Sequence, residues 1–330
     1  MLGSSLTSAL LLAVAVSLLA LSGPTHAWWC KGHMVVNEIA KRHLNQNVAA
    51  FVDEAAANLS FSGPFPQFFD FVQSACWADD IKSRGLYVMD DWHFIDTPYN
   101  PLNVPIKKDP VGKDNAKTVI ESLTKTLENK KGHKLVPYIL SFALVNLAHF
   151  YGDIHQPLHS ITLFSPTYPD GDRGGNLEVV HVRGATMKLH AVWDSICQGE
   201  QPDLPRPLSE KEYAKLRAFA DYLEDTYKPT TAEKSETNVT VMAEESYKIG
   251  VEVAYPGIVN GMKLTEEYLE RCKKAAEPRL VLAGHRLATI LNHVFSDVGT
   301  DQSLKSGSRC RAPSSFLHVI FRGAMLGSNE

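Results

Sequence analysis

The organisation of this chain is decided by the segment His149-Phe150-Tyr151-Gly152-Asp153-Ile154-His155-Gln156-Pro157-Leu158-His159. This segment ends an apolar run that starts near Leu135. Residues four apart share one face of a helix, so His149 and Asp153 are expected to lie side by side. Pro157 should end that helix, because it lacks a backbone donor and restricts the residue before it. His159 can therefore point in a direction that a continuing helix would not allow.

Apolar residues outside this segment also recur mainly at helical spacing. The ranges with this pattern are 32–44, 48–59, 66–83, 115–131, 135–156, 186–196, 209–227, 243–254 and 265–298. The last helix is expected to break near Pro278. Residues 177–183 predict a strand, and residues 165–176 and 228–241 predict loops. The sequence therefore predicts one all-α domain with a short β-hairpin-like segment near 160–183.

Both ends of the chain differ in composition from this helical domain, which we place at 28–298. Residues 1–27 hold an apolar run followed by small residues, a pattern typical of a signal peptide cleaved before Trp28. An uncleaved anchor is the alternative interpretation, but an apolar run of about 13 residues is short for a bilayer. The tail at 299–330 is polar and rich in Ser and Gly, and we expect it to be poorly ordered.

The charge of the chain argues against one class of nucleic-acid-binding protein. The net charge of −4 has the wrong sign for a protein that binds nucleic acid through a basic surface. In a secretory compartment, scattered cysteines predict one or two disulfides with a thiol left over, and spacing leaves the pairing open. The cysteines are Cys30, Cys76, Cys197, Cys272 and Cys310. Sequons at Asn58 and Asn238 predict N-glycans on a secreted chain.

Histidine and aspartate recur in pairs at helical spacing. His190 and Asp194 repeat the spacing of His149 and Asp153. A single pair of this kind is more often a salt bridge or a satisfied buried histidine. Two pairs, one of them extended by His159 beyond a proline, favour metal ligation instead. Imidazole and carboxylate without thiolate form the ligand set of catalytic zinc.

A set of ordered motifs carries a resemblance to a known family. The motifs are Trp28-x4-His33, Trp77-Ala78-Asp79, Trp92-His93-Phe94-Ile95-Asp96, the run from His149 to His159, and Gly174-Gly175-Asn176 leading to His190-x3-Asp194. Their order resembles the zinc-dependent class I nucleases, which are the single-strand-specific nucleases and 3′-nucleotidases of fungi, plants and kinetoplastid parasites. That family shares a mainly helical fold with bacterial zinc phospholipases C. Taken alone, His33, Asp79 and His93 would be interpreted as structural residues.

The resemblance implies a cluster of three zinc ions. The ligand sets would be Asp79, His93, His149 and Asp153 for the first, Asp153, His33 and the amine and carbonyl oxygen of Trp28 for the second, and His159, His190 and Asp194 for the third. Trp28 could supply its amine only after signal cleavage. Metal-activated water would attack phosphorus and the 3′ P–O bond would break. Asp79 and Asp153 are the implied catalytic residues, with Asp79 orienting the water or accepting its proton.

The resemblance also assigns contacts with the substrate. Phe94 matches the position that stacks on the nucleobase, and Asp96 matches the one that binds the edge of the base. Stacking accepts any unpaired base, which predicts single-strand preference without sequence specificity. Lys82 occupies a place where relatives commonly carry an arginine that contacts phosphate. A lysine cannot form the bidentate contact of a guanidinium, so Arg84 is an alternative.

These features predict a zinc phosphodiesterase that hydrolyses RNA and single-stranded DNA to 5′-nucleotides and removes phosphate from 3′-nucleotides. The expected location is the secretory pathway, with the product secreted, retained in an endomembrane compartment or held at the cell surface. No protein partner and no membrane span after signal cleavage are indicated. A zinc phospholipase C on the same fold and a non-catalytic zinc-binding helical protein are the alternatives. Phe94 and Asp96 argue against the phospholipase.

Overall fold

The computed structural model of the chain describes residues 28–60, 70–129, 136–198 and 204–298. The contacts divide the chain into two units, Met1–Ser296 and Asp297–Glu330, and the fold described below is that of the first unit. The expected signal peptide and tail, residues 1–27 and 299–330, lie outside the described residues.

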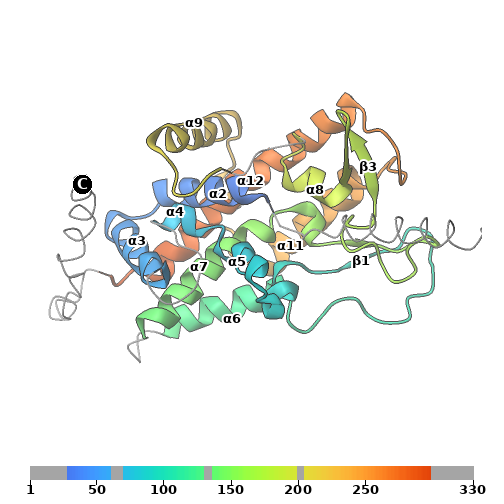
Figure 1. Cartoon of the computed structure of the whole chain (residues 1–330). Helices are drawn as coiled ribbons and strands as arrows, with labels where there is room; N and C mark the ends of the chain where they lie inside the picture. The colour runs from blue at the N-terminus through green and yellow to red at the C-terminus, as the bar shows by residue number, and fades with distance from the viewer. Residues whose placement is uncertain (1–27, 61–69, 130–135, 199–203, 299–330) are drawn as a thin grey trace, which may run out of the picture. The chain divides into compact units, whose positions relative to one another are not determined.

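Helices dominate the described chain, and the all-α prediction is confirmed (Figure 1). The longer helices are α2 (Cys30–Arg42), α3 (Gln46–Ser60), α6 (Ala116–Glu128), α7 (Pro137–Asp153), α9 (Glu210–Thr226), α11 (Val239–Ile249) and α12 (Glu266–Val294). The shorter ones are α4 (Phe71–Ser74), α5 (Trp77–Asp80), η1 (Lys82–Arg84), η2 (Tyr87–His93), η4 (Pro157–His159), α8 (Leu189–Asp194), α10 (Thr231–Ser235) and the π-helical η5 (Gly250–Ala254).

Helix α7 is the central support of the site. It packs against α3, α5 and α6 (Figure 1). Every residue from Ala143 to Asp153 is buried. Pro137 suits its first turn, where a missing backbone donor costs nothing. The helix ends at Asp153, and a 3-10 turn begins at Pro157. The break that the sequence predicts before His159 is therefore present.

Helices α2 and α12 pack closely on each other. A Cβ at Gly284 would lie 2.5 Å from Cγ2 of Ile39, so this position accepts only glycine at the present separation. Helix α12 is continuous across Pro278, and the predicted break there is wrong. Neighbours of Pro278 such as Ala276 and Leu280 are fully buried. Tertiary packing thus outweighs the lost helical hydrogen bond.

Two other helix predictions need correction. In the described part of 66–83, one helix is replaced by the short helices α4 and α5, which Ala75 and Cys76 separate. The disulfide of Cys76 with Cys30 fixes the chain at this interruption. The range 228–241 is not a loop, since it contains α10 and the start of α11. Side-chain caps from Thr230 and Asn238 begin these helices.

The strands are short and lie in two separate pairs. Strand β1 (Pro98–Tyr99) runs parallel to β2 (Thr162–Leu163), and β3 (Val179–Val182) forms an antiparallel hairpin with β4 (Ala185–Lys188). The hairpin therefore lies later than the predicted 160–183. Arg183 and Gly184 both have positive φ, as a tight two-residue hairpin turn requires. The helix predicted from residue 186 consequently begins only at Leu189.

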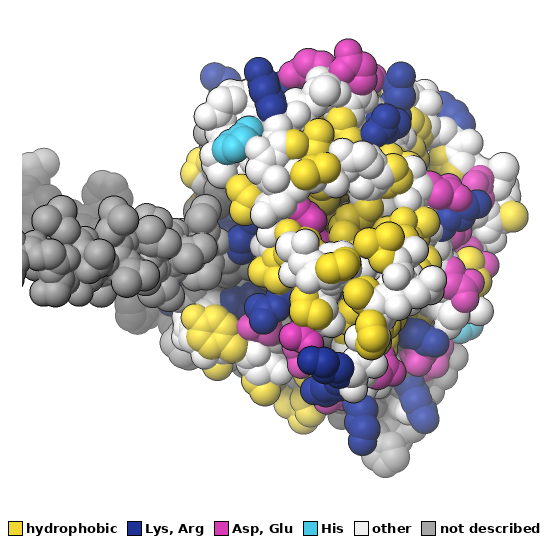
Figure 2. All heavy atoms as spheres, turned by 90° about the vertical axis from the view of Figure 1, so that its right-hand side faces the viewer, with side chains coloured by type: hydrophobic (Ala, Val, Ile, Leu, Met, Phe, Trp, Pro, Cys, Tyr) yellow, Lys and Arg dark blue, Asp and Glu magenta, His cyan; other side chains and the backbone are white. Residues whose placement is uncertain are grey.

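Two disulfides, Cys30–Cys76 and Cys197–Cys272, confirm the predicted number and supply the pairing that spacing left open. Cys310 lies outside the described residues. On the face that Figure 2 presents, hydrophobic side chains gather in the middle, while Lys and Arg lie toward the edges among Asp and Glu. None of the helices searched in the described chain has the length and apolar character needed to cross a bilayer.

Candidate metal centre

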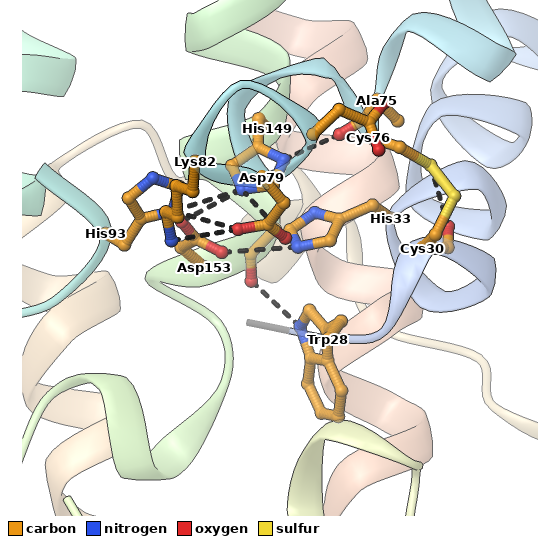
Figure 3. Close-up of polar contacts among 12 residues, drawn as sticks. Trp28, Cys30, His33, Ala75, Cys76, Asp79, Lys82, His93, His149 and Asp153 are labelled. Atoms are coloured by element: carbon orange, nitrogen blue, oxygen red, sulfur yellow. Dashed lines mark hydrogen bonds and ion pairs between the residues drawn. A yellow bond between two sulfur atoms is a disulfide. The ribbon is translucent and has the colours of Figure 1, made fainter. Parts of the chain in front are cut away.

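Segments far apart in the sequence bring the predicted side-chain ligands into two buried groups. The contributing residues are His33 from α2, Asp79 from α5, His93 from the end of η2, His149 and Asp153 from α7, His159 from η4, and His190 and Asp194 from α8. None of these residues is more than 6% exposed. Figure 3 shows the side chains of the first group pointing toward one another. Such a concentration of histidine and carboxylate in a protein interior calls for a compensating cation.

Asp153 lies at the centre of the first group. Its Oδ1 is 3.3 Å from Nε2 of His33. Its Oδ2 is 2.9 Å from Nδ1 of His93 and 3.4 Å from Nε2 of His149. Asp79 lies beside these residues, with carboxylate oxygens 3.7 Å from the same nitrogens of His93 and His149. The two oxygens of Asp153 thus face different histidines, which is the arrangement required of a carboxylate shared by two metal ions.

The second group is formed by His159, His190 and Asp194. The Nε2 atoms of the two histidines are 3.1 Å apart. Asp194 oxygens lie 3.6 Å from Nε2 of His190 and 3.9 Å from Nε2 of His159. The Nδ1 of His159 donates to the carbonyl of His93, and the Nδ1 of His190 donates to that of Gly174, each at 2.6 Å. Each neutral ring then has only a lone pair at Nε2, so no proton lies between the two Nε2 atoms.

The donor spacing in both groups fits a tetrahedral zinc ion. With zinc–nitrogen bonds of about 2.0–2.1 Å, neighbouring ligand nitrogens lie about 3.3 Å apart. The 3.1 Å between the facing lone pairs of His159 and His190 is close to this value. A cation between these nitrogens would turn a repulsive contact into two bonds. The residues present therefore fit zinc on their own geometry.

Backbone and side-chain contacts hold the ligands in place. Nδ1 of His149 donates to the carbonyl of Ala75 at 2.6 Å, which turns Nε2 toward Asp153. Nε2 of Gln156 donates to Oδ1 of Asp194 at 2.6 Å. Gln156 is fully buried, and its own Oε1 accepts the backbone N–H of Leu158. The sequence did not single out Gln156, whose only signal was its place between two ligands. Contacts of this kind fix the orientation of metal ligands.

Two glycines permit the close approach of ligand side chains. A Cβ at Gly152 would lie 2.6 Å from Nδ1 of His33, so only glycine at this turn of α7 leaves room for that ring. Gly174 has φ +61, and a Cβ there would lie within van der Waals overlap of the carbonyl oxygen of Leu158. The same residue presents its carbonyl to His190. The Gly174-Gly175 pair is thus explained by the ligand that it anchors.

Burial sets the protonation states of the ligands. Desolvation lowers the pKa of His93, His149 and His159 and lowers the pKa of His190 to about 4. These rings are therefore neutral at pH 7 and can donate a lone pair. Desolvation raises the pKa of Asp153 and Asp194. A cation at each group would reverse that effect and keep the carboxylates ionised.

Trp28 lies against the first group although it is not a side-chain ligand. It is fully buried, and its indole Nε1 donates to the carbonyl of Gly152 at 2.9 Å (Figure 3). The backbone N–H of Trp29 donates to the carbonyl of Asp194 at 3.0 Å. The Cys30–Cys76 disulfide connects this segment to the short helix that carries Asp79. The segment from Trp28 to Cys30 is thus tied to both metal groups.

Comparison with known proteins identifies the family. A family profile described as S1/P1 Nuclease matches residues 28–296. The chain belongs to the S1/P1 nuclease family. Endonuclease 2 of Arabidopsis thaliana is 28% identical over 292 residues, covering 86% of this chain and 95% of that protein. Endonuclease 3 of the same plant is 29% identical over 285 residues, covering 82% and 89%. Nuclease S1 of Aspergillus oryzae is 24% identical over 315 residues, covering 87% and 98%.

Membership confirms the resemblance drawn from the motifs and its coarser functional consequences. S1/P1 nucleases are zinc-dependent hydrolases that act on nucleic acids. The matched range coincides with the described helical unit, which contains both candidate metal groups. The zinc that this family requires therefore has a chemically suitable set of donors in this chain.

Of the residues expected to contact substrate in this S1/P1 nuclease, Lys82 contacts the first metal group directly. Nζ of Lys82 is 3.0 Å from Oδ1 of Asp79, and Lys82 is buried (Figure 3). Arg84 is exposed. Phe94 and Asp96 lie one and three residues after His93 and are half-buried. Burial, together with the neighbouring carboxylates of Asp172 and Asp91, raises the pKa of Asp96 to about 7.

Asp172 is a supporting residue that the sequence interpretation missed. It is fully buried and accepts hydrogen bonds from the hydroxyl of Tyr255 at 2.9 Å, from the N–H of Leu163 at 2.7 Å and from the N–H of Gly175 at 2.8 Å. These contacts fix the segment that leads to Gly174 and place a negative charge near Asp96. Composition identified this region only as a loop. An aspartate followed closely by paired glycines was the one available signal.

His155 is turned away from the metal groups. Its Nδ1 lies 2.7 Å from the carbonyl oxygen of Tyr151, and its Nε2 lies 3.1 Å from a guanidinium nitrogen of Arg286. Glu245 accepts hydrogen bonds from Arg286 and Arg279 on the same side of the helix end. His155 therefore joins the end of α7 to helices α11 and α12. These contacts fix the segment between Asp153 and His159.

Proposed function

We propose that the chain is a zinc phosphodiesterase that hydrolyses RNA and single-stranded DNA to 5′-nucleotides and also acts as a 3′-nucleotidase. The observation that carries the proposal is the convergence of the histidine and aspartate ligands in two buried groups with zinc-like spacing. Three zinc ions would be bound. The proposed ligands are Asp79, His93, His149 and Asp153 for one, Asp153, His33 and the backbone of Trp28 for the second, and His159, His190 and Asp194 for the third.

When bound, zinc supplies Lewis-acid activation of water and stabilises negative charge on phosphate and the departing 3′ oxygen. The chain's own residues would position the reactants. Asp153 would hold the first and second metal sites together through its two oxygens. Asp79 would accept a hydrogen bond from the attacking water and take up its proton. Lys82, 3.0 Å from Asp79, would add a positive charge where the phosphate approaches.

Phe94 and Asp96 would select the part of the substrate that precedes the cleaved bond. Phe94 would stack on an unpaired base, and Asp96 would bind the edge of that base. Stacking of this kind requires the base to be out of a duplex, which would restrict cleavage to single strands. Because the pKa of Asp96 is raised to about 7, its carboxylate accepts hydrogen bonds more fully as pH rises through neutrality.

The same proposal includes maturation of the chain. Cleavage after residue 27 would give Trp28 the free amine that the second zinc needs. Burial of Trp28 and its hydrogen bond to Gly152 support a fixed position for that amine. Two disulfides support a secretory location. Asn58 and Asn238 are both exposed, as N-glycan acceptors must be.

Substrate comparison tests this function. The purified mature protein should hydrolyse 3′-AMP, poly(A) and single-stranded DNA, and should act poorly on duplex DNA and on phosphatidylcholine. Replacing Phe94 by Ala should weaken turnover of poly(A) by about 10-fold or more, since stacking contributes about 1–3 kcal/mol per base. Turnover of the lipid alone would identify a phospholipase instead. Fewer than two zinc ions per purified chain would support the non-catalytic alternative.

A further inference from the structure

A third group of potential metal ligands lies outside the centre described above. It consists of His43 at the end of α2, Glu224 in the last turn of α9 and His285 in the middle of α12. We call it the α2–α9–α12 triad. One atom from each side chain lies within 4.8 Å of the other two. His43 is 41% exposed in its side chain, Glu224 is 21% exposed and His285 is 8% exposed. The triad is therefore open to solvent on the side of His43.

One carboxylate oxygen faces both imidazoles of the triad. Oε1 of Glu224 is 2.6 Å from Nε2 of His43 and 3.6 Å from Nε2 of His285. The two rings are 4.1 Å apart between centroids and tilted by 41°. Glu224 also contacts Arg42 at 3.2 Å through its other oxygen, Oε2. The oxygen that faces the histidines is thus separate from the one paired with arginine.

The charges around the triad favour a divalent cation. Hydrogen bonds and charge from His43 and Arg42 help to keep the pKa of Glu224 low against its partial burial, so it is ionised at neutral pH. Burial is the main cause that lowers the pKa of His285 to about 4, so its ring is neutral. Arg42 and Lys234 are the neighbouring cations, and Asp221 and Glu38 bind the same Arg42 guanidinium. The triad also lies at the carboxyl ends of α2 and α9, where helix dipoles attract cations.

Few atoms would have to move to complete a metal site. The backbone of His43 is held to α12 by Asn292, whose Nδ2 donates to the carbonyl of His43 at 2.9 Å. The side chain of His43 is exposed, and its ring already lies 4.1 Å from that of His285 between centroids. Two histidines and one glutamate leave a fourth position for water, a ligand set that zinc uses in proteins. Binding would replace the proton between His43 and Glu224.

We propose that His43, Glu224 and His285 form an accessory binding site for zinc or a similar divalent transition metal. The cation would bridge α9 to α2 and α12. Helix α2 also carries His33, and His43 lies ten residues further on, about 15 Å along the helix axis. The accessory ion would therefore act on the packing of α9 and on resistance to unfolding, and not on the reacting phosphate.

Zinc content at controlled free zinc tests this site. The mature holoprotein and the variants His43→Ala and Glu224→Gln would be dialysed against the same series of zinc buffers, and zinc per chain measured by mass spectrometry. The wild type should reach a plateau one zinc per chain above both variants. Each variant should bind the extra ion about 100-fold or more weakly, since even loss of an outer-shell partner costs about 10–100-fold. Added zinc should raise the unfolding temperature of the wild type and leave that of His43→Ala and Glu224→Gln unchanged.

Asp221→Asn is the matched control, because Asp221 lies on the same helix and binds the same Arg42 without belonging to the triad. This variant should keep the extra zinc. Hydrolysis of poly(A) by His43→Ala should equal that of the wild type, which would show that the buried groups remain loaded. Equal zinc plateaus for wild type, His43→Ala and Glu224→Gln would overturn the proposal. The test depends only on the difference in zinc per chain between the wild type and the variants. It therefore holds whatever number of zinc ions the buried groups bind.

Discussion

The group His159, His190 and Asp194 and the α2–α9–α12 triad each combine two imidazoles with one carboxylate, but they are built in opposite ways. In the buried group, both Nδ1 atoms donate to backbone carbonyls, so the orientation of each ring is fixed before a metal arrives. In the triad, the Nε2 of His43 instead makes its hydrogen bond with Glu224, the carboxylate that would share its metal. The side chains of the buried group are at most 6% exposed, whereas that of His43 is 41% exposed.

This difference shows how similar ligand groups can bind metal ions with different affinity and exchange rate. Ligand side chains that outer contacts already hold in place lose little conformational entropy when a metal binds. A bound cation stabilises a desolvated carboxylate more than an exposed one. A triad that must first break its own hydrogen bond binds more weakly and exchanges faster. We therefore expect the buried groups to hold permanent ions and the triad to follow the zinc concentration.

The largest effect should come from removing the carboxylate that lies at the centre of the first group. Asp153→Asn should lower kcat/KM on poly(A) by about 1000-fold, equivalent to about 4 kcal/mol, because one oxygen no longer carries the charge that two metal sites share. Glu224→Gln makes the same chemical change in the triad and should alter kcat/KM by less than about twofold. Zinc content and steady-state rates measure both variants. Similar losses of kcat/KM in Asp153→Asn and Glu224→Gln would show that the triad and the buried groups do not differ in their importance for activity.

An intermediate effect should come from the contact that orients Asp194. Gln156→Leu keeps the approximate volume but removes the 2.6 Å donor to that carboxylate. The affinity of the group His159, His190 and Asp194 for zinc should fall about 10–100-fold, as it does when other outer-shell partners of metal ligands are removed. The free zinc concentration that gives half of the maximal activity should be higher for the variant than for the wild type. At saturating zinc, the activity of the variant should return to that of the wild type.

Gln73→Leu is the control for this change. Gln73 is likewise buried and hydrogen-bonded, but its partners are Asp70 and the backbone of Leu208. Gln73→Leu should lower the stability of the fold without moving the zinc dependence of activity. Equal shifts in the two variants would mean that buried glutamines affect activity through folding alone.

Sequence reasoning predicted the fold well where a local pattern determined it. Periodicity located α7, and the proline rule placed its end before His159. It failed where tertiary packing decides the outcome. Helix α12 continues through Pro278 because residues on both sides are buried, and the range 66–83 is interrupted where Cys76 is bound to Cys30.

The candidate site shows the same division. Spacing alone favoured the pairs on α7 and α8, but His33, Asp79 and His93 needed the family resemblance to be singled out. Their proximity arises from contacts between distant segments, such as the close approach of His33 to Gly152. Gln156 and Asp172 were missed for a related reason. Their roles depend on hydrogen bonds to partners that no local pattern reveals.

The smallest effect, a dependence of stability on pH, should come from the triad itself. The pKa of His285 is lowered from 6.5 to about 4 in the folded chain, mainly by burial. Between these values the unfolded chain binds the proton and the folded chain does not, so stability rises with pH across this window. His285→Gln should remove part of this dependence. The unfolding temperature of the wild type should fall about 2–4 °C further than that of the variant between pH 7 and pH 4.

Zinc should increase the difference between the wild type and His285→Gln in the pH dependence of the unfolding temperature. Metal and protons compete for the same ring nitrogen, so zinc binding is lost as pH falls. Added zinc should therefore steepen the pH dependence of the wild type and leave His285→Gln unchanged. His293→Gln, an exposed position on the same helix, should behave as the wild type. Titration of unfolding temperature at fixed free zinc would measure all three proteins. A zinc effect that persists in His285→Gln would assign the whole response to the buried groups and leave the triad as an ion pair.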